Sequence, residues 1–140
     1  MEPRAIAVHG GGDLVVGNGP NVEGLVHCQV DRREEYRNPG RYSFILAARQ
    51  ASELAEALRF GATARITTFS GSVIVSWSNS LAMLWFYPYG ADQSEYVLRL
   101  YEGAIEAAAE ALVEAADEAT VDEDAVWQRA RHFESPRAAA

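Results

Sequence analysis

The chain has 140 residues, a formal net charge of −8 and 49% hydrophobic residues. This length and apolar content favour one folded domain and exclude a disordered chain. All twelve basic residues are arginine, and the absence of lysine excludes a P-loop and a Schiff-base lysine. Cys28 is the only cysteine, so an intrachain disulfide is excluded and a cytoplasmic location is expected.

The first half of the chain predicts several strands followed by a short helix. Residues 5–17 have the glycine-rich pattern of a β-hairpin, and alternating apolar residues over 22–30 and 42–48 predict two more strands. A helix is expected from an N-cap at Ser52 to a stop at Gly61, since these residue types are preferred at the two ends of a helix.

The second half predicts a three-stranded meander over residues 64–69, 72–78 and 81–87. The last of these strands is apolar on both faces, so it is expected inside the sheet or covered on both sides. Serine and asparagine interrupt this apolar region, so no membrane-spanning segment is expected.

Two helices are expected after the meander, a long one over 93–118 and a short one over about 121–133. The expected fold is therefore α+β. It has an antiparallel sheet of about five to six strands in ββ(β)-α-βββ-αα order, with the helices packed mainly on one face. The expected domain covers residues 1–134, and residues 135–140 form a flexible tail.

The negative charge is concentrated in one segment. Residues 100–128 contain nine acids and no base, whereas the other residues contain eleven acids and twelve arginines. Five of the nine acids recur at every fourth position, which places them on one face of the expected long helix. This acidic row consists of Glu102, Glu106, Glu110, Glu114 and Glu118. Like charges four residues apart destabilise a helix slightly, so helix stability does not explain the row.

No catalytic, cofactor or metal site is assigned from the sequence. The run His9–Gly12 resembles an esterase oxyanion loop, but the chain has no G-x-S-x-G nucleophile elbow. The residues 17–20 match half of a dinucleotide fingerprint without the third glycine or the helix that it requires. His27 and Asp31 are about 13 Å apart along one strand, too far to share a metal ion.

The sequence favours a non-catalytic protein-binding module of the adaptor, chaperone or inhibitor/immunity type. The acidic row would dock a protein partner with a basic surface, and Trp85 and Tyr87 would supply a hydrophobic anchor. In such an interface, charge chiefly sets the association rate, while buried aromatic side chains supply affinity.

Two other functions remain open. One is a small-ligand binder or small enzyme with a pocket near His9, His27 and the glycine-rich hairpin. The other is a DNA-mimicking inhibitor, which would need a second acidic row about one duplex width from the first. Nucleic-acid binding is disfavoured by the net charge. A homodimer would form if the acidic row of one copy paired with a loop of the other that carries Arg32, Arg33, Arg37 and Arg41.

Overall fold

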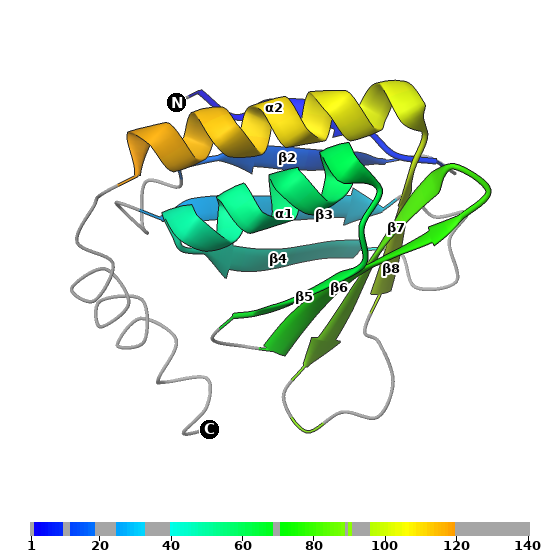
Figure 1. The fold of residues 1–140 in the computed structure, drawn as a ribbon. Helices are drawn as coiled ribbons and strands as arrows, with labels where there is room; N and C mark the ends of the chain where they lie inside the picture. The colour runs from blue at the N-terminus through cyan, green and yellow to red at the C-terminus, as the bar shows by residue number, and fades with distance from the viewer. Residues whose placement is uncertain are drawn as a thin grey trace.

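A computed structural model of the chain describes residues 2–9, 12–18, 25–32, 40–68, 71–88, 90 and 96–119. It confirms the α+β class, with two antiparallel sheets of four strands each and two helices (Figure 1). The expectation of one sheet with five to six strands is corrected to these two sheets. Within the described residues, four strands followed by a helix occur twice.

The first sheet and its helix follow the order expected for the first half. The strands are β1 (Arg4–Ala7), β2 (Asp13–Gly17), β3 (Val26–Arg32) and β4 (Gly40–Leu46), and each pairs with the next. Helix α1 (Ala48–Phe60) follows directly. The predicted N-terminal hairpin is confirmed, because Ala7 pairs with Asp13 across its turn.

The second sheet contains the predicted meander and one further strand. Its members are β5 (Ala64–Thr67), β6 (Gly71–Ser78), β7 (Leu81–Pro88) and β8 (Tyr96–Leu100), again paired in chain order. Helix α2 (Glu102–Glu118) follows β8. The predicted internal position of β7 is confirmed, because it pairs with both β6 and β8.

The turn between β6 and β7 also matches the prediction. Asn79 and Ser80 have φ values of 50° and 67°, which is the left-handed conformation that a two-residue hairpin with the correct twist requires. At the other end of β6, a side chain on Gly71 would collide with the backbone of Tyr87 and Pro88 on β7. Glycine at this position therefore allows the two strands to approach each other.

The predicted helix over 93–118 begins too early, because residues 96–100 form β8 and α2 starts only at Glu102. Leu98 and Leu100 are fully buried and alternate with Val97 and Arg99, which is the period-two pattern of a strand. Pairing with β7 stabilises this strand against the helix that the same residues would otherwise continue.

The predicted N-cap of α1 is also corrected, because Ser52 lies inside the helix and Ala47 is the N-cap. Gln50 explains the earlier start. Its Oε1 accepts the Ala47 N–H at 3.0 Å, and its Nε2 donates to the Thr67 carbonyl on β5 at 2.6 Å. The predicted stop at Gly61 is confirmed by its left-handed φ of 64°.

The two helices lie side by side on one face of the first sheet, as Figure 1 shows. Helix α2 packs chiefly against α1, β2 and β1, and one cluster of buried residues joins both helices to both sheets. Many of the α2 residues in this cluster are small, which allows close approach. They include Ala108, Ala109, Ala111 and Ala115, all with 0% exposure.

His9 and Asn18 each make a hydrogen bond to a residue that lies far away in the chain. The His9 N–H donates to the Arg99 carbonyl at 2.8 Å, which ties the end of β1 to β8 and joins the two sheets. The Asn18 side-chain amide donates to the Leu25 and Ala115 carbonyls at 3.0 and 3.1 Å. Asn18 thereby holds the end of β2 against α2.

Some expectations fall outside the described residues. They are the glycine pair 10–11, the arginines at 33 and 37, the helix over about 121–133 and the tail at 135–140.

Candidate functional site: the acidic face of α2 and the adjoining groove

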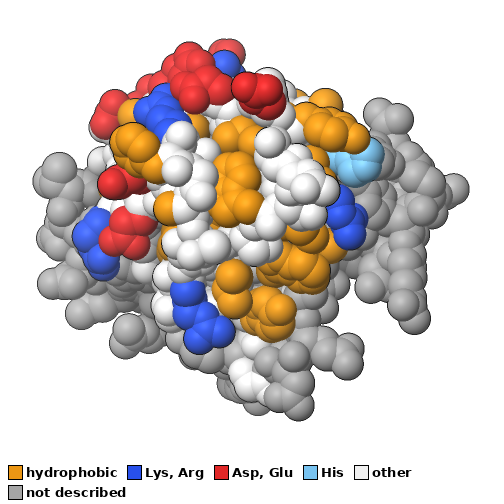
Figure 2. Space-filling view, turned by 45° about the vertical axis from the view of Figure 1, so that its right-hand side comes forward, with side chains coloured by type: hydrophobic (Ala, Val, Ile, Leu, Met, Phe, Trp, Pro, Cys, Tyr) orange, Lys and Arg blue, Asp and Glu red, His pale blue; other side chains and the backbone are white. Residues whose placement is uncertain are grey.

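All five glutamates of the acidic row are exposed, and the opposite side of α2 is buried. Acidic side chains gather along the top of the molecule in Figure 2, where α2 runs in Figure 1. The row extends over about 24 Å, since sixteen residues separate its first and last members and each adds about 1.5 Å. The face predicted from the four-residue spacing is therefore a continuous exposed surface.

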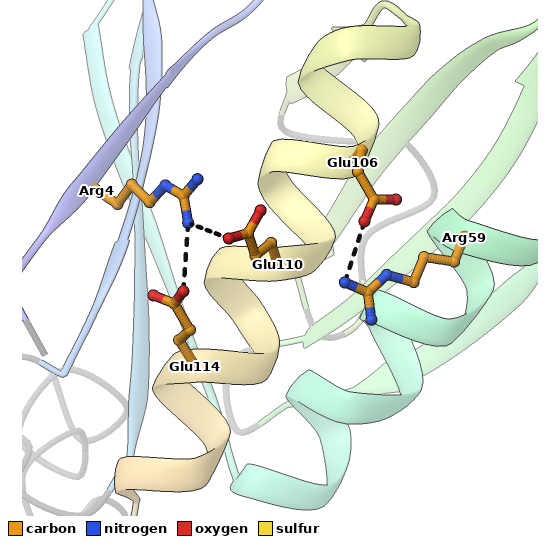
Figure 3. Close-up of polar contacts among 5 residues, drawn as sticks. All are labelled: Arg4, Arg59, Glu106, Glu110 and Glu114. Carbon is orange, nitrogen blue, oxygen red and sulfur yellow. Dashed lines mark hydrogen bonds and ion pairs between the residues drawn. The ribbon is translucent and has the colours of Figure 1, made fainter.

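Two arginines from other elements contact the row from opposite sides of α2 (Figure 3). Arg4 on β1 points between Glu110 and Glu114, with nitrogen–oxygen distances of 3.6 and 3.7 Å. Arg59 on α1 donates a hydrogen bond to Glu106 at 3.2 Å. The repulsion along the row is therefore partly offset by tertiary contacts that the four-residue spacing does not reveal.

These ion pairs leave the face of α2 negative. All of them are solvent-exposed to a substantial degree, and such pairs contribute about 0–1 kcal/mol each to folding. Helix α2 also carries Asp117, so it has six acids and no base of its own. The two arginines lower this charge without cancelling it, and a negative field remains above the helix.

An open groove of about 510 Å³ adjoins the N-terminal end of the acidic row. It lies where the end of α1, the start of α2 and the turn between β6 and β7 meet. Its lining combines apolar, aromatic and charged side chains. They include Leu58, Arg59, Trp77, Glu102, Ile105 and Glu106. The acidic row and the groove are therefore continuous, because Glu102 and Glu106 belong to both.

Two exposed aromatic residues are chain neighbours of residues that line the groove. Phe60 is 78% exposed and Tyr101 is 58% exposed, and they are the exposed large hydrophobic residues among those the structure describes. Phe60 lies between the lining residues Arg59 and Gly61, and Tyr101 directly precedes Glu102. Exposed aromatic residues beside a concave surface are typical of protein-binding sites.

Trp85 and Tyr87 lie elsewhere. They are half-buried on the face of β7 opposite to Ala82, Leu84 and Phe86, which belong to the core cluster. The Trp85 Nε1–H donates to Ser76 Oγ at 2.7 Å on the neighbouring strand. Because α2 packs on the core side, the structure does not bring this aromatic pair to the acidic row.

The groove instead contains Trp77, which the sequence interpretation did not assign to the site. Its Nε1–H donates to the Ala62 carbonyl at 2.9 Å, directly after the end of α1. Arg59 was also missed, and it lies 47 residues from its partner Glu106 in the chain. Only the packing of α1, β6 and α2 against one another brings these residues together, so no local sequence pattern indicates them.

The histidines proposed for a small-ligand site lie at opposite ends of the first sheet. His9 follows the end of β1 beside Asp13, whereas His27 pairs with Gly17. These two ends are about 13 Å apart along β2. His9 is exposed, and its ring contacts Tyr101 edge-on, with centroids 4.6 Å apart. His27 is half-buried, and burial lowers its pKa.

Cys28 follows His27 in β3, but its side chain lies on the inner face of the sheet and is fully buried. Burial raises the pKa of its thiol far above the usual range, so the reactive thiolate is not accessible there. Within the described part of the chain, no three histidine, cysteine or acidic side chains gather in a way that suits a metal ion.

The described helices include none with the length and apolar content needed to cross a bilayer. Comparisons of the chain with protein-family models, with curated proteins and with solved structures gave no match.

Proposed function

We propose that this protein is a non-catalytic protein-binding module whose docking face combines the acidic row of α2 with the adjoining groove. Its partner is a protein with a basic surface. The proposed setting is the cytoplasm, which the single unpaired cysteine favours.

One observation carries the proposal: the exposed acidic row ends at a groove lined in part by Trp77, and the exposed residues Phe60 and Tyr101 are chain neighbours of groove-lining residues. Charge along α2 would steer a basic partner toward this face and raise its association rate. The aromatic residues would then provide the contact area from which affinity arises. The acidic row alone has a simpler explanation as a solubilising surface, which does not account for the aromatic residues at its end.

The test is capture of partners from an extract of the native host, followed by binding kinetics with the purified partner. Wild type is compared with a variant in which four glutamates of the row become glutamine. The substitutions are Glu102→Gln, Glu106→Gln, Glu110→Gln and Glu114→Gln. We expect the variant to bind the captured partner with an association rate about tenfold lower at low salt.

A control variant removes four acids outside α2, so that its net charge matches that of the test variant. Its substitutions are Glu2→Gln, Asp13→Asn, Asp31→Asn and Glu56→Gln. This control should retain association kinetics close to wild type. Equal loss in both variants would mean that only the net charge matters, and unchanged kinetics in the α2 variant would reject the proposed docking face.

A further inference from the structure

We propose that the groove receives an arginine side chain of the partner protein. This inference rests on the proposed function and names the chemistry recognised at one end of the docking face. The groove has an apolar wall, formed in part by Leu58 and Ile105, and an acidic side formed by Glu102 and Glu106. Its volume of about 510 Å³ lies in the range of sites that enclose a small ligand, which is enough for one long side chain and the backbone beside it.

The charge of the groove selects a cation. Glu106 is already paired with Arg59 at 3.2 Å. Glu102, in contrast, makes neither an ion pair nor a hydrogen bond with any other residue that the structure describes. Among the described lining residues, the two carboxylates and one guanidinium therefore leave one net negative charge. The negative end of the α1 dipole at Gly61 and the positive end of the α2 dipole at Glu102 both lie at this groove and offset each other, so its net charge comes from the side chains.

The aromatic lining favours arginine among the cationic side chains. Trp77 lines the groove, and the hydrogen bond from its Nε1–H to the Ala62 carbonyl holds the ring in one orientation. A planar guanidinium stacks on an indole ring while its N–H groups bind a carboxylate in a forked arrangement. Lysine offers only a compact and strongly hydrated ammonium group, so it gains less from the same two contacts.

The groove lies where a basic partner attracted to the acidic row would reach it. Glu102 is the first residue of α2 and the first member of the acidic row. A basic surface that lies along the row can therefore place one arginine beyond the end of the helix and into the groove. Arg59 occupies the near side of the same space with its bond to Glu106, which leaves Glu102 for the incoming side chain.

The experiment titrates the full-length protein with three capped tripeptides of the form Gly-X-Gly, in which X is arginine, lysine or citrulline. Binding is followed by two-dimensional NMR at the indole N–H of Trp77 and the backbone N–H of Gly61, with the Trp77 signal assigned from Trp77→Phe. We expect the arginine peptide to shift both signals saturably, the lysine peptide to bind more weakly, and citrulline, which has the shape of arginine without its charge, to cause no saturable shift.

Two exposed substitutions provide a matched pair. Glu102→Gln should weaken binding of the arginine peptide by about fivefold, because it removes the uncompensated charge. Glu2→Gln removes one exposed acid beside β1 and should leave binding unchanged. Equal binding of citrulline, or full binding by Glu102→Gln, would overturn the arginine site.

An oligo-arginine peptide separates failure of this inference from failure of the proposed function. If that peptide shifts the signals of Glu110 and Glu114 while the arginine tripeptide leaves Trp77 unmoved, the groove does not receive arginine, but the acidic row still binds basic chains. If the oligo-arginine peptide does not bind either, both the groove site and the proposed docking face are rejected.

Discussion

Strand β3 and helix α2 both carry ionisable side chains, but they differ in how far those side chains are exposed to water. In β3, Cys28 is fully buried and its pKa is raised, while half-buried His27 has a lowered pKa because burial disfavours the imidazolium ion. The glutamates of α2 remain exposed, and arginines from β1 and α1 contact them. Burial therefore disfavours the charged forms of His27 and Cys28, whereas the glutamates of α2 carry their charge on the exposed surface.

The largest effect on stability is expected when a charge is placed at a buried position of β3. Cys28→Asp would put a carboxylate into the core cluster, where desolvation opposes ionisation and no partner is available among the neighbouring valine and phenylalanine side chains of the cluster. We expect a loss of at least about 4 kcal/mol in the free energy of unfolding, measured by urea denaturation followed by circular dichroism.

The reciprocal substitution, Glu110→Val, removes a charge from the exposed row and should change the free energy of unfolding by less than about 1 kcal/mol. In wild type, a thiol reagent should modify Cys28 only when the protein unfolds. Rapid modification of the native protein, or a small effect of Cys28→Asp, would show that β3 is accessible to water.

A second prediction concerns His27 and pH. Because burial lowers its pKa in the folded state, the unfolded chain binds a proton first as the pH falls below about 6.5. The stabilising contribution of neutral His27 is thus fully present above this pH and is lost as the pH decreases through it. We expect the free energy of unfolding to fall less steeply between about pH 7.5 and about pH 5.5 in His27→Gln than in wild type. Parallel curves for the two proteins would contradict the lowered pKa.

The smallest change in the free energy of unfolding is expected when an exposed ion pair of α2 is removed. Arg59→Gln removes a tertiary pair with Glu106 and should lower the free energy of unfolding by about 0.5–1 kcal/mol at low salt, since the pair also offsets repulsion along the row. Arg49→Gln removes the pair with Glu53 within α1 and should cost about 0.3–0.5 kcal/mol. High salt should diminish both losses. A salt-independent loss above about 2 kcal/mol for Arg59→Gln would mean that Arg59 has a structural role beyond charge.

Local sequence patterns were sufficient for most of the fold. Alternation predicted the meander and the N-terminal hairpin, and the positions of β6, β7 and their turn are confirmed. Residues 96–100 were misassigned because Val97 and Tyr101 also fit a helical spacing, and only pairing with β7 selects the strand. Likewise, the start of α1 depends on a hydrogen bond from Gln50 to β5. The prediction at Ser52 rests on the preference of serine for N-cap positions, which takes no account of this bond.

Only the part of the candidate site that is formed by residues close together in the sequence could be predicted. The spacing of the five glutamates was enough to place them on one face, and their exposure is now described. The groove combines residues from α1, β6 and α2, so it depends on how these elements pack. The same packing explains why Trp77 lies beside the acidic row while Trp85 and Tyr87 lie on the other face of the sheet.

The contact of α2 with β1 and β2 has a consequence for how the protein is made. These strands leave the ribosome before the helix that covers them, which is encoded about a hundred residues later. Translation proceeds at about 5–20 residues per second. The apolar side chains of β2, such as Leu14 and Val16, are therefore synthesised on the order of ten seconds before the helix that buries them. Apolar surface therefore stays exposed on the nascent chain during this interval, and we expect a chain truncated before Glu102 to aggregate.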